Sequence, residues 1–357
     1  MDDLLNVCDY ERRAAELLPP GPLAYFAAGA GDEWTLRENV AAYRRWTLRP
    51  RVLRDVETVS TAATVLGTDV AMPILVAPMA YQRLAHPDGE LAMARAAAKA
   101  GTVMCVSTAS TASPAEIAAA APDAPRWFQV YVFRDRELTR DWVERARDEG
   151  YRALVLTADT PYLGRRERDV RTGWKIPEDL DVHAVAAALG SMQSMTVADQ
   201  FGIFSPSVSW RDIEQLATWS ALPVLVKGVH TAEDALLAVE HGAAGVIVSN
   251  HGGRQLDGVA ATLDALPEVV EAVAGRLAVL LDGGIRRGID VVTALALGAD
   301  AVLAGRAVLW GLAVDGEAGA ARVLELLREE LWLALALSGC CSPGEVTRAH
   351  VARATTL

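Results

Sequence analysis

Cysteines, long apolar runs and basic residues are all scarce in this chain. Its 357 residues include four cysteines without CxxC spacing, and adjacent Cys340 and Cys341 could bridge each other only with strain, so we expect reduced thiols and no metal site. No run approaches the roughly 18 apolar residues of a membrane-spanning helix. The N-terminus, MDDLLNVCDYERR, lacks the basic and apolar regions of a signal peptide. The 34 basic residues face 46 acidic ones, and the net charge of -12 opposes binding to nucleic acid or an anionic membrane. These absences predict a cytoplasmic protein that acts on a small molecule.

Eight short apolar or β-branched runs alternate with helical stretches from Pro73 onward. This alternation is typical of repeated βα units and a parallel sheet. The predicted strands are PILVAP (73–78), TVMCVS (102–107), WFQVYV (127–132), ALVLTAD (153–159), PVLVKG (223–228), GVIVSN (245–250), AVLLDGG (278–284) and AVLAGR (301–306). Eight of them predict an α/β fold, a closed (β/α)8 TIM barrel. We expect a single domain over residues 1–357, with its barrel core at about 73–337.

Glycines and short polar residues mark the ends of the predicted helices. A glycine in the left-handed conformation turns the chain back toward the next strand, a part assigned to Gly101, Gly150, Gly242 and Gly298. The expected N-caps are Asp88, Ser113, Asp135 and Thr231.

Two segments lie outside this pattern. One is an N-terminal extension of about 72 residues, and the other is a long loop after strand four, from about Arg171 to Ser209. So long a loop is unusual in a compact domain unless it has a function. It has no continuous apolar face and no basic cluster, which gives membrane docking little support and favours an active-site lid.

The C-terminal ends of the strands are where barrels of this kind build their active sites. Polar residues and glycines gather there: Pro78 to Ala80, Ser107, Gln129, Tyr131, Thr157, Asp159, Lys227, Ser249 to Arg254, Asp282 to Arg286, Gly305 and Arg306. We expect all of them to face one pocket.

The last two strand ends, DGGIRRG and AGR, predict a phosphate site. Many barrels bind phosphate after strands seven and eight through backbone N–H groups, with which arginines can cooperate. The alternative is that Gly283, Gly284 and Gly305 only form tight turns and that the arginines are solvated.

His251 emerges after an apolar strand, beside glycines and Arg254. A lone histidine is more often structural than catalytic. Here Asp159, at another strand end, could hold its tautomer and stabilise its protonated form, which favours a catalytic base.

Lys227 directly follows the apolar run of strand five. It could be a snorkelling lysine, a Schiff-base lysine, or a fixed positive charge that stabilises a developing anion. The residues alone leave these alternatives open.

The run SNHGGRQLDG (249–258) resembles the signature of the FMN-dependent 2-hydroxy-acid oxidase and dehydrogenase family, which includes glycolate oxidase, lactate oxidase, mandelate dehydrogenase and hydroxymandelate oxidase. The resemblance also covers YFAAGAGDEWTLREN (25–39), PILVAPMA (73–80), WFQVYVFRDR (127–136), LTADTPYLGRRERD (156–169), LPVLVKGV (222–229), VLLDGGIRRG (279–288) and LALGADAVLAGR (295–306). It therefore spans nearly the whole chain.

This resemblance implies that FMN binds at the mouth of the barrel. The residues that would line the flavin ring are Pro78, Met79, Ala80, Ser107, Gln129, Thr157 and Lys227, the last as a cation near the N1 edge. Asp282 would meet the ribityl chain, and Gly284, Arg286, Gly305 and Arg306 would hold the phosphate. Ser249 and Gly283 complete the expected cofactor contacts.

The resemblance also implies a substrate site. Arg254 and Arg166 would grip the substrate carboxylate, because a guanidinium matches it in bidentate fashion, with help from Tyr25 and Tyr131. His251 would take a proton while two electrons pass to the flavin, by a hydride or a carbanion route, and Asp159 would steady the imidazolium. The expected catalytic residues are thus His251, Asp159, Tyr131 and Arg254.

Ala109 marks a departure within the family. Plant-type glycolate oxidases have a tryptophan where Ala109 stands, whereas mandelate dehydrogenase shares the sequence STAS found here at 107–110. The segment APMAYQRLAHPDGE (77–90) also resembles hydroxymandelate oxidases. A larger pocket, and hence an aromatic or branched (S)-2-hydroxy acid, is the expected consequence.

Other properties follow from the resemblance with less detail. We expect oxygen as the electron acceptor, with a quinone or another carrier as the alternative, and a homotetramer or homo-octamer. A barrel lyase that uses Lys227 is the competing function. The C-terminus, ARATTL, lacks an SKL-type peroxisomal address, in keeping with a cytoplasmic enzyme.

Overall fold

The computed structural model describes residues 3–190 and 194–354, and its centre is a closed barrel of eight parallel strands. The strands are β4 (Ile74–Val76), β5 (Met104–Val106), β6 (Arg126–Val130), β7 (Ala153–Thr157), β8 (Val224–Val229), β9 (Gly245–Val248), β10 (Ala278–Asp282) and β11 (Ala301–Ala304). β11 pairs with β4 and so closes the barrel. Each strand coincides with one of the eight predicted runs, and the predicted fold is confirmed.

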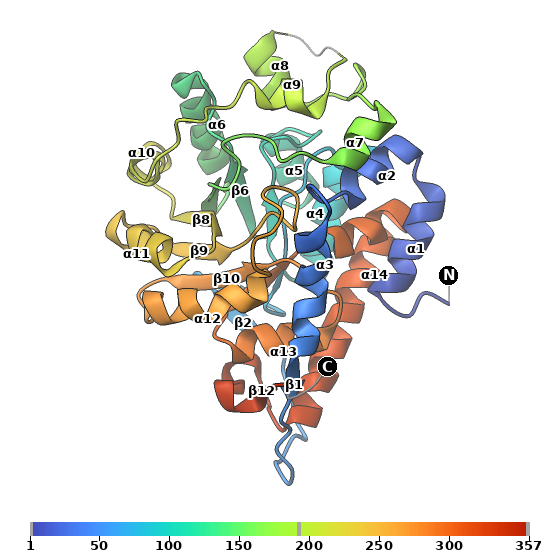
Figure 1. Cartoon of the computed structure of the whole chain (residues 1–357), viewed down its shortest axis with the longest axis vertical. Coiled ribbons are helices and arrows are strands. Elements are labelled where there is room, and N and C mark those ends of the chain that lie inside the picture. Colours follow the sequence, from blue (N-terminus) through green and yellow to red (C-terminus); the bar gives the residue numbers. More distant parts are fainter. Residues whose placement is uncertain (1–2, 191–193, 355–357) are drawn as a thin grey trace.

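Helices surround the barrel, one or more after each strand (Figure 1). They are α4 (Gly89–Lys99), α5 (Pro114–Ala120), α6 (Arg136–Asp148), α10 (Arg211–Ser220), α11 (Ala232–Glu240), α12 (Thr262–Val273), α13 (Gly288–Ala296) and α14 (Arg306–Ser338), the last kinked at Asp315 and Gly316.

Alternate residues of each strand face opposite sides, so the barrel separates two apolar clusters. Leu75, Cys105, Trp127, Val155 and Leu225 belong to the cluster inside the barrel, whereas their neighbours along the strands pack outward against the helices. This alternation decides which residue at a strand end points into the barrel mouth.

The predicted helix ends are largely confirmed. All four glycines, at 101, 150, 242 and 298, have positive φ. Ser113, Asp135 and Thr231 accept backbone N–H bonds as N-caps, but Asp88 occupies its cap position without such a bond.

The N-terminal extension forms three helices, α1 (Val7–Leu17), α2 (Pro20–Ala27) and α3 (Trp34–Ala41), then a short ribbon. In that ribbon β1 (Trp46–Leu48) pairs with β12 (Val351–Arg353). A separate hairpin of β2 (Ala63–Val65) and β3 (Thr68–Val70) follows. Figure 1 shows the β1–β12 pair toward the end of the molecule opposite α8 and α9.

The long segment after β7 also has structure of its own. It contains α7 (Glu167–Thr172), α8 (His183–Leu189) and α9 (Val197–Phe201), rather than one continuous loop. Residues 191–193 of this segment, and residues 355–357 on which the peroxisomal-address argument partly depends, lie outside the described residues.

All four cysteines are free. Within the described ranges, no helix is both long enough and apolar enough to cross a bilayer.

Candidate active site

A pocket of about 1140 Å³, including its open mouth, lies at the C-terminal ends of the strands. Of the predicted site residues, those lining it are Tyr25, Pro78, Met79, Ala80, Ser107, Ala109, Gln129, Tyr131, Thr157, Arg166, Lys227, His251, Arg254, Asp282, Gly283, Gly284, Arg286, Gly305 and Arg306. The two others, Asp159 and Ser249, contact lining residues from behind. The structure therefore brings the whole predicted set together.

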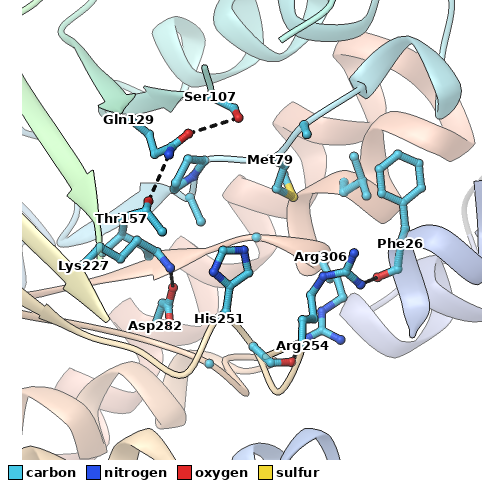
Figure 2. Close-up of a pocket in the computed structure, with 18 of the residues that line it drawn as sticks. Phe26, Met79, Ser107, Gln129, Thr157, Lys227, His251, Arg254, Asp282 and Arg306 are labelled. Carbon is cyan, nitrogen blue, oxygen red and sulfur yellow. Dashed lines mark hydrogen bonds and ion pairs between the residues drawn. The ribbon is translucent and has the colours of Figure 1, made fainter. Parts of the chain in front are cut away.

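Strand alternation explains how the polar groups enter the mouth. Gln129, Thr157 and Lys227 each stand two residues beyond an interior residue of the barrel, so their side chains point inward. Gln129 donates to Thr157 Oγ1 (3.0 Å) and accepts from Ser107 Oγ (3.2 Å), a chain visible in Figure 2. One wall of the pocket is thus a fixed series of polar groups.

Lys227 is buried but paired. Its Nζ lies 2.9 Å from Asp282 Oδ2 and donates to Ser249 Oγ at 2.8 Å. Burial would lower the pKa of Lys227, but Asp282 and Asp159 outweigh it and raise the pKa above its usual value. The snorkelling alternative is wrong, because the side chain is only 5% exposed. A charged amine is also a poor Schiff-base nucleophile.

His251 has a left-handed backbone, with φ of 57°, which places its side chain in the mouth between Lys227 on one side and Arg254 with Arg306 on the other (Figure 2). His251 Nδ1 lies 3.0 Å from Asp159 Oδ1. With Nδ1–H donating to the carboxylate, Nε2 keeps a free lone pair.

The charges of this pair favour a neutral imidazole and an ionised carboxylate. Burial, with the charges of Lys227 and Arg166 nearby, lowers the pKa of His251 despite the opposing effect of Asp159. Burial would raise the pKa of Asp159, but His251 and Lys227 together lower it. At neutral pH the histidine is ready to accept a proton.

Arg254 and Arg166 form a cationic wall near Tyr25. Arg254 donates to the carbonyls of Phe26 (3.2 Å) and Ala28 (2.7 Å), and its guanidinium lies 5.2 Å from the centroid of the Tyr25 ring. Burial and the neighbouring Arg166 lower the pKa of Arg254 to about 10. Such a buried cation is stabilised by an anion in the pocket.

A second cationic region follows β10 and β11. Burial, with Arg286 and Arg254 nearby, lowers the pKa of Arg306 to about 9. A Cβ on Gly305 would be in ordinary van der Waals contact with Ala77 Cβ (3.5 Å) and Met79 Sδ (3.6 Å). Gly284, by contrast, has to be glycine, because a Cβ there would overlap the carbonyl oxygen of Asn39 on α3.

The pocket also has aromatic lining residues that were not predicted from the sequence. Phe26, Tyr81, Phe201 and Phe204 line it, and the rings of Phe201 and Phe204 lie 5.5 and 4.9 Å from that of Tyr131. The two phenylalanines of FGIF (201–204) in this segment were the available signal. Tyr81 also donates a hydrogen bond to Gln200 on α9. The long segment therefore covers one side of the pocket.

The donor set fits a flavin nucleotide. Arg306 is a buried cation that makes no salt bridge within the described residues, which suits a phosphate, whereas Arg286 Nε lies 3.4 Å from Glu11 Oε2. Asp282 Oδ1 is buried with no partner within the described residues, and it can accept from a ribityl hydroxyl. Hydrogen-bond donors and acceptors for the edge of the flavin ring come from Ser107, Gln129 and Thr157, and Lys227 supplies a positive charge.

Comparisons with known proteins agree with this geometry. Residues 14–353 match the model of the FMN-dependent dehydrogenase family. The chain is 51% identical to glycolate oxidase 3 of Oryza sativa subsp. indica, over 98% of this chain and 97% of that protein. It is 49% identical to glycolate oxidase of Spinacia oleracea, over 98% and 96%. A structure of mandelate oxidase with (S)-4-hydroxymandelic acid superimposes with a TM-score of 0.93 at 43% identity, covering 99% of this chain and all of that one (100%).

Proposed function

Because the chain belongs to the FMN-dependent 2-hydroxy-acid oxidase family and its cofactor is FMN, we propose that it oxidises an aromatic or branched (S)-2-hydroxy acid to the 2-oxo acid, with His251 as the base. The observation that carries the proposal is the free Nε2 of a neutral His251, held by Asp159 in a pocket with Arg254 and Arg166.

When bound, FMN accepts the two electrons that the substrate loses. Arg254 and Arg166 bind the carboxylate and so orient the C2 carbon toward His251, with Tyr25 and Tyr131 as further contacts. His251 takes a proton at Nε2, and Asp159 stabilises the imidazolium that results. Lys227 would place its positive charge near the flavin ring, and Asp282 would bind the ribityl chain. Arg286, Gly305 and Arg306 would bind the phosphate.

Ala109 supports the choice of a large substrate. It is buried, with 4% exposure, and it lines the pocket with a methyl group only. The aromatic rings of Tyr131, Phe201 and Phe204 supply apolar walls that a phenyl or branched side chain could cover. Glycolate has no side chain to fill this space.

The test is the ratio of kcat/KM for (S)-mandelate to that for glycolate. We expect a ratio above one in the wild type and its reversal in Ala109→Trp, because an indole overpacks the space that a phenyl group needs. Ala115→Trp, the same change at an exposed position of α5, should leave the ratio unchanged. A wild-type preference for glycolate would contradict the assignment.

Oxygen is the proposed acceptor, which the oxidase names of the relatives support. Flavin reduced anaerobically by substrate should be reoxidised by air with one hydrogen peroxide per substrate; slow reaction with oxygen and fast reaction with a soluble quinone would favour the dehydrogenase alternative.

We further propose a cytoplasmic homotetramer or homo-octamer. Four free cysteines suit a reducing compartment. Light scattering on the purified holoenzyme and fractionation of the source cells test the two parts separately.

A further inference from the structure

A reciprocal pair of buried amides joins the N-terminal helix α3 to the loop that carries His251. Asn39 Nδ2 donates to Asn250 Oδ1 at 2.8 Å, and Asn250 Nδ2 donates to Asn39 Oδ1 at 2.8 Å. Asn39 is 1% exposed. Asn250 directly precedes His251, and its Oδ1 also accepts from the N–H of Gly253 (3.0 Å), so the amide shapes the turn around the histidine.

The same helix holds the rest of this loop closely. Asp257 accepts from the backbone N–H groups of Trp34 (3.3 Å) and Thr35 (2.8 Å), which satisfies the first turn of α3. Its N-cap position, Glu33, makes no such bond. A Cβ on Gly253 would overlap the backbone of Leu36. Figure 1 shows α3, in blue, beside the orange loop that follows β9.

Asn39 also reaches the loop after β10. Its Oδ1 accepts from the N–H of Thr262 (3.3 Å), and Thr262 Oγ1 donates to the carbonyl of Asp282 (2.5 Å). Its main-chain carbonyl oxygen lies against Gly284, where no Cβ fits. One residue, Thr262, thus separates Asn39 from the main chain of Asp282, and one residue, Asn250, separates it from His251.

We propose that Asn39 is a positioning residue that sets the His251 loop and the Asp282–Gly284 loop in register with each other. Asparagine suits this place because one planar group donates to Asn250 and accepts from both Asn250 and Thr262. The proposal rests on the proposed function only for the role of His251. It gives a role to α3, which contributes no residue to the lining of the pocket.

The experiment compares the holoenzymes of Asn39→Ala, Asn39→Asp and Val40→Ala, the last a partly exposed neighbour on α3. In Asn39→Ala we expect flavin reduction at saturating substrate to slow at least ~10-fold, because small misplacement of catalytic groups can cost about 100-fold. The Kd for FMN should rise by a similar ~10-fold factor, since both loops move. Asn39→Asp, which keeps the acceptor and loses the donor, should lie between Asn39→Ala and wild type.

Hydrogen exchange gives a readout that does not depend on turnover. Amides of residues 249–254 and 282–285 should exchange faster in Asn39→Ala, and not in Val40→Ala. For flavin reduction, the double variant Asn39→Ala with Asn250→Ala should slow by less than the product of the two single effects, because both changes break the same amide pair. A lower Tm with unchanged reduction, FMN affinity and loop exchange would overturn the proposal, and so would additive effects. If none of the 2-hydroxy acids tried reduces the flavin of the wild type, the proposed function fails, while hydrogen exchange and FMN affinity still test the role of Asn39.

Discussion

At the scale of single residues, the environment of His251 determines its protonation. Removing an imidazole from water disfavours the charged form, and this effect, with Lys227 and Arg166 nearby, lowers the pKa of His251 despite Asp159. In the proposed mechanism the free histidine is therefore neutral, and the carboxylate of Asp159 stabilises it after it has taken the substrate proton. This is the order of events that a general base requires.

Replacement of His251 by asparagine should slow flavin reduction by about 100- to 10,000-fold, the usual worth of positioned acid–base catalysis. FMN should remain bound, because Lys227, Arg286 and Arg306 are unchanged. Stopped-flow bleaching of the flavin absorbance and the FMN content of the purified variant measure the two effects. Near-normal reduction would remove His251 from its role.

The lowered pKa of His251 predicts the acid side of the pH profile. Reduction should stay fast at pH 6.5, the usual pKa of histidine, and fall only below it, as the imidazole becomes protonated. In Asp159→Asn the carboxylate that raises this pKa is lost, so the falling limb should move to still lower pH while the maximal rate decreases. The measurement is the reduction rate between about pH 5 and 8. A limb that moves to higher pH would contradict the assigned contact.

At the scale of elements, α4 ties together two loops of the active site. Glu90 is fully buried, and its carboxylate accepts from the N–H groups of Gln82 (3.1 Å) and Thr111 (3.0 Å) and from the Thr111 hydroxyl. These loops carry Met79 and Ala109. All three hydrogen bonds come from uncharged groups, and burial raises the pKa of Glu90.

Glu90→Leu should lower the free energy of unfolding by roughly 2–4 kcal/mol, because it leaves two buried N–H groups without acceptors. Glu90→Gln keeps the acceptor for both N–H groups and should lose less. Denaturant unfolding at a fixed FMN concentration tests this order, with Glu137→Leu, at a side chain 79% exposed, as the control. Equal losses in the leucine and glutamine variants would contradict the role of the acceptor.

The sequence predicted the eight strands because short apolar or β-branched runs alternate with helical stretches, and it predicted the pocket because polar residues follow those runs. It did not predict α8 and α9, whose few turns lack a repeating apolar face, or the approach of Phe201 and Phe204 to Tyr131. The parts played by Asn39 and Tyr81 depend on contacts between segments far apart in the chain, which no local pattern specifies. Gly284 illustrates the same limit: its phosphate contact stays a prediction, and the structure adds a close approach of α3 that the sequence did not indicate.

At the scale of the whole molecule, charge is distributed unevenly. The chain carries a net charge of -12, yet Arg166, Arg254, Arg286 and Arg306 converge on one pocket. Burial, and after it repulsion between neighbouring arginines, lowers the pKa values of Arg254 and Arg306. An anionic ligand should therefore stabilise the fold as well as occupy the site.

Arg306→Met tests this link between binding and stability. In the FMN-free protein, loss of a buried cation relieves repulsion from Arg286 and Arg254 but leaves the carbonyl of Gly252 without its donor. Because these effects oppose each other, Tm should change little.

In the wild type, FMN at 100 times its Kd should add about 2.7 kcal/mol of stability, a rise of several degrees in Tm. Most of that rise should disappear in Arg306→Met at the same FMN concentration. Arg287→Met, at a neighbour whose side chain is 47% exposed and paired with Glu330, should retain it. A full FMN-dependent rise in Arg306→Met would show that the phosphate binds elsewhere.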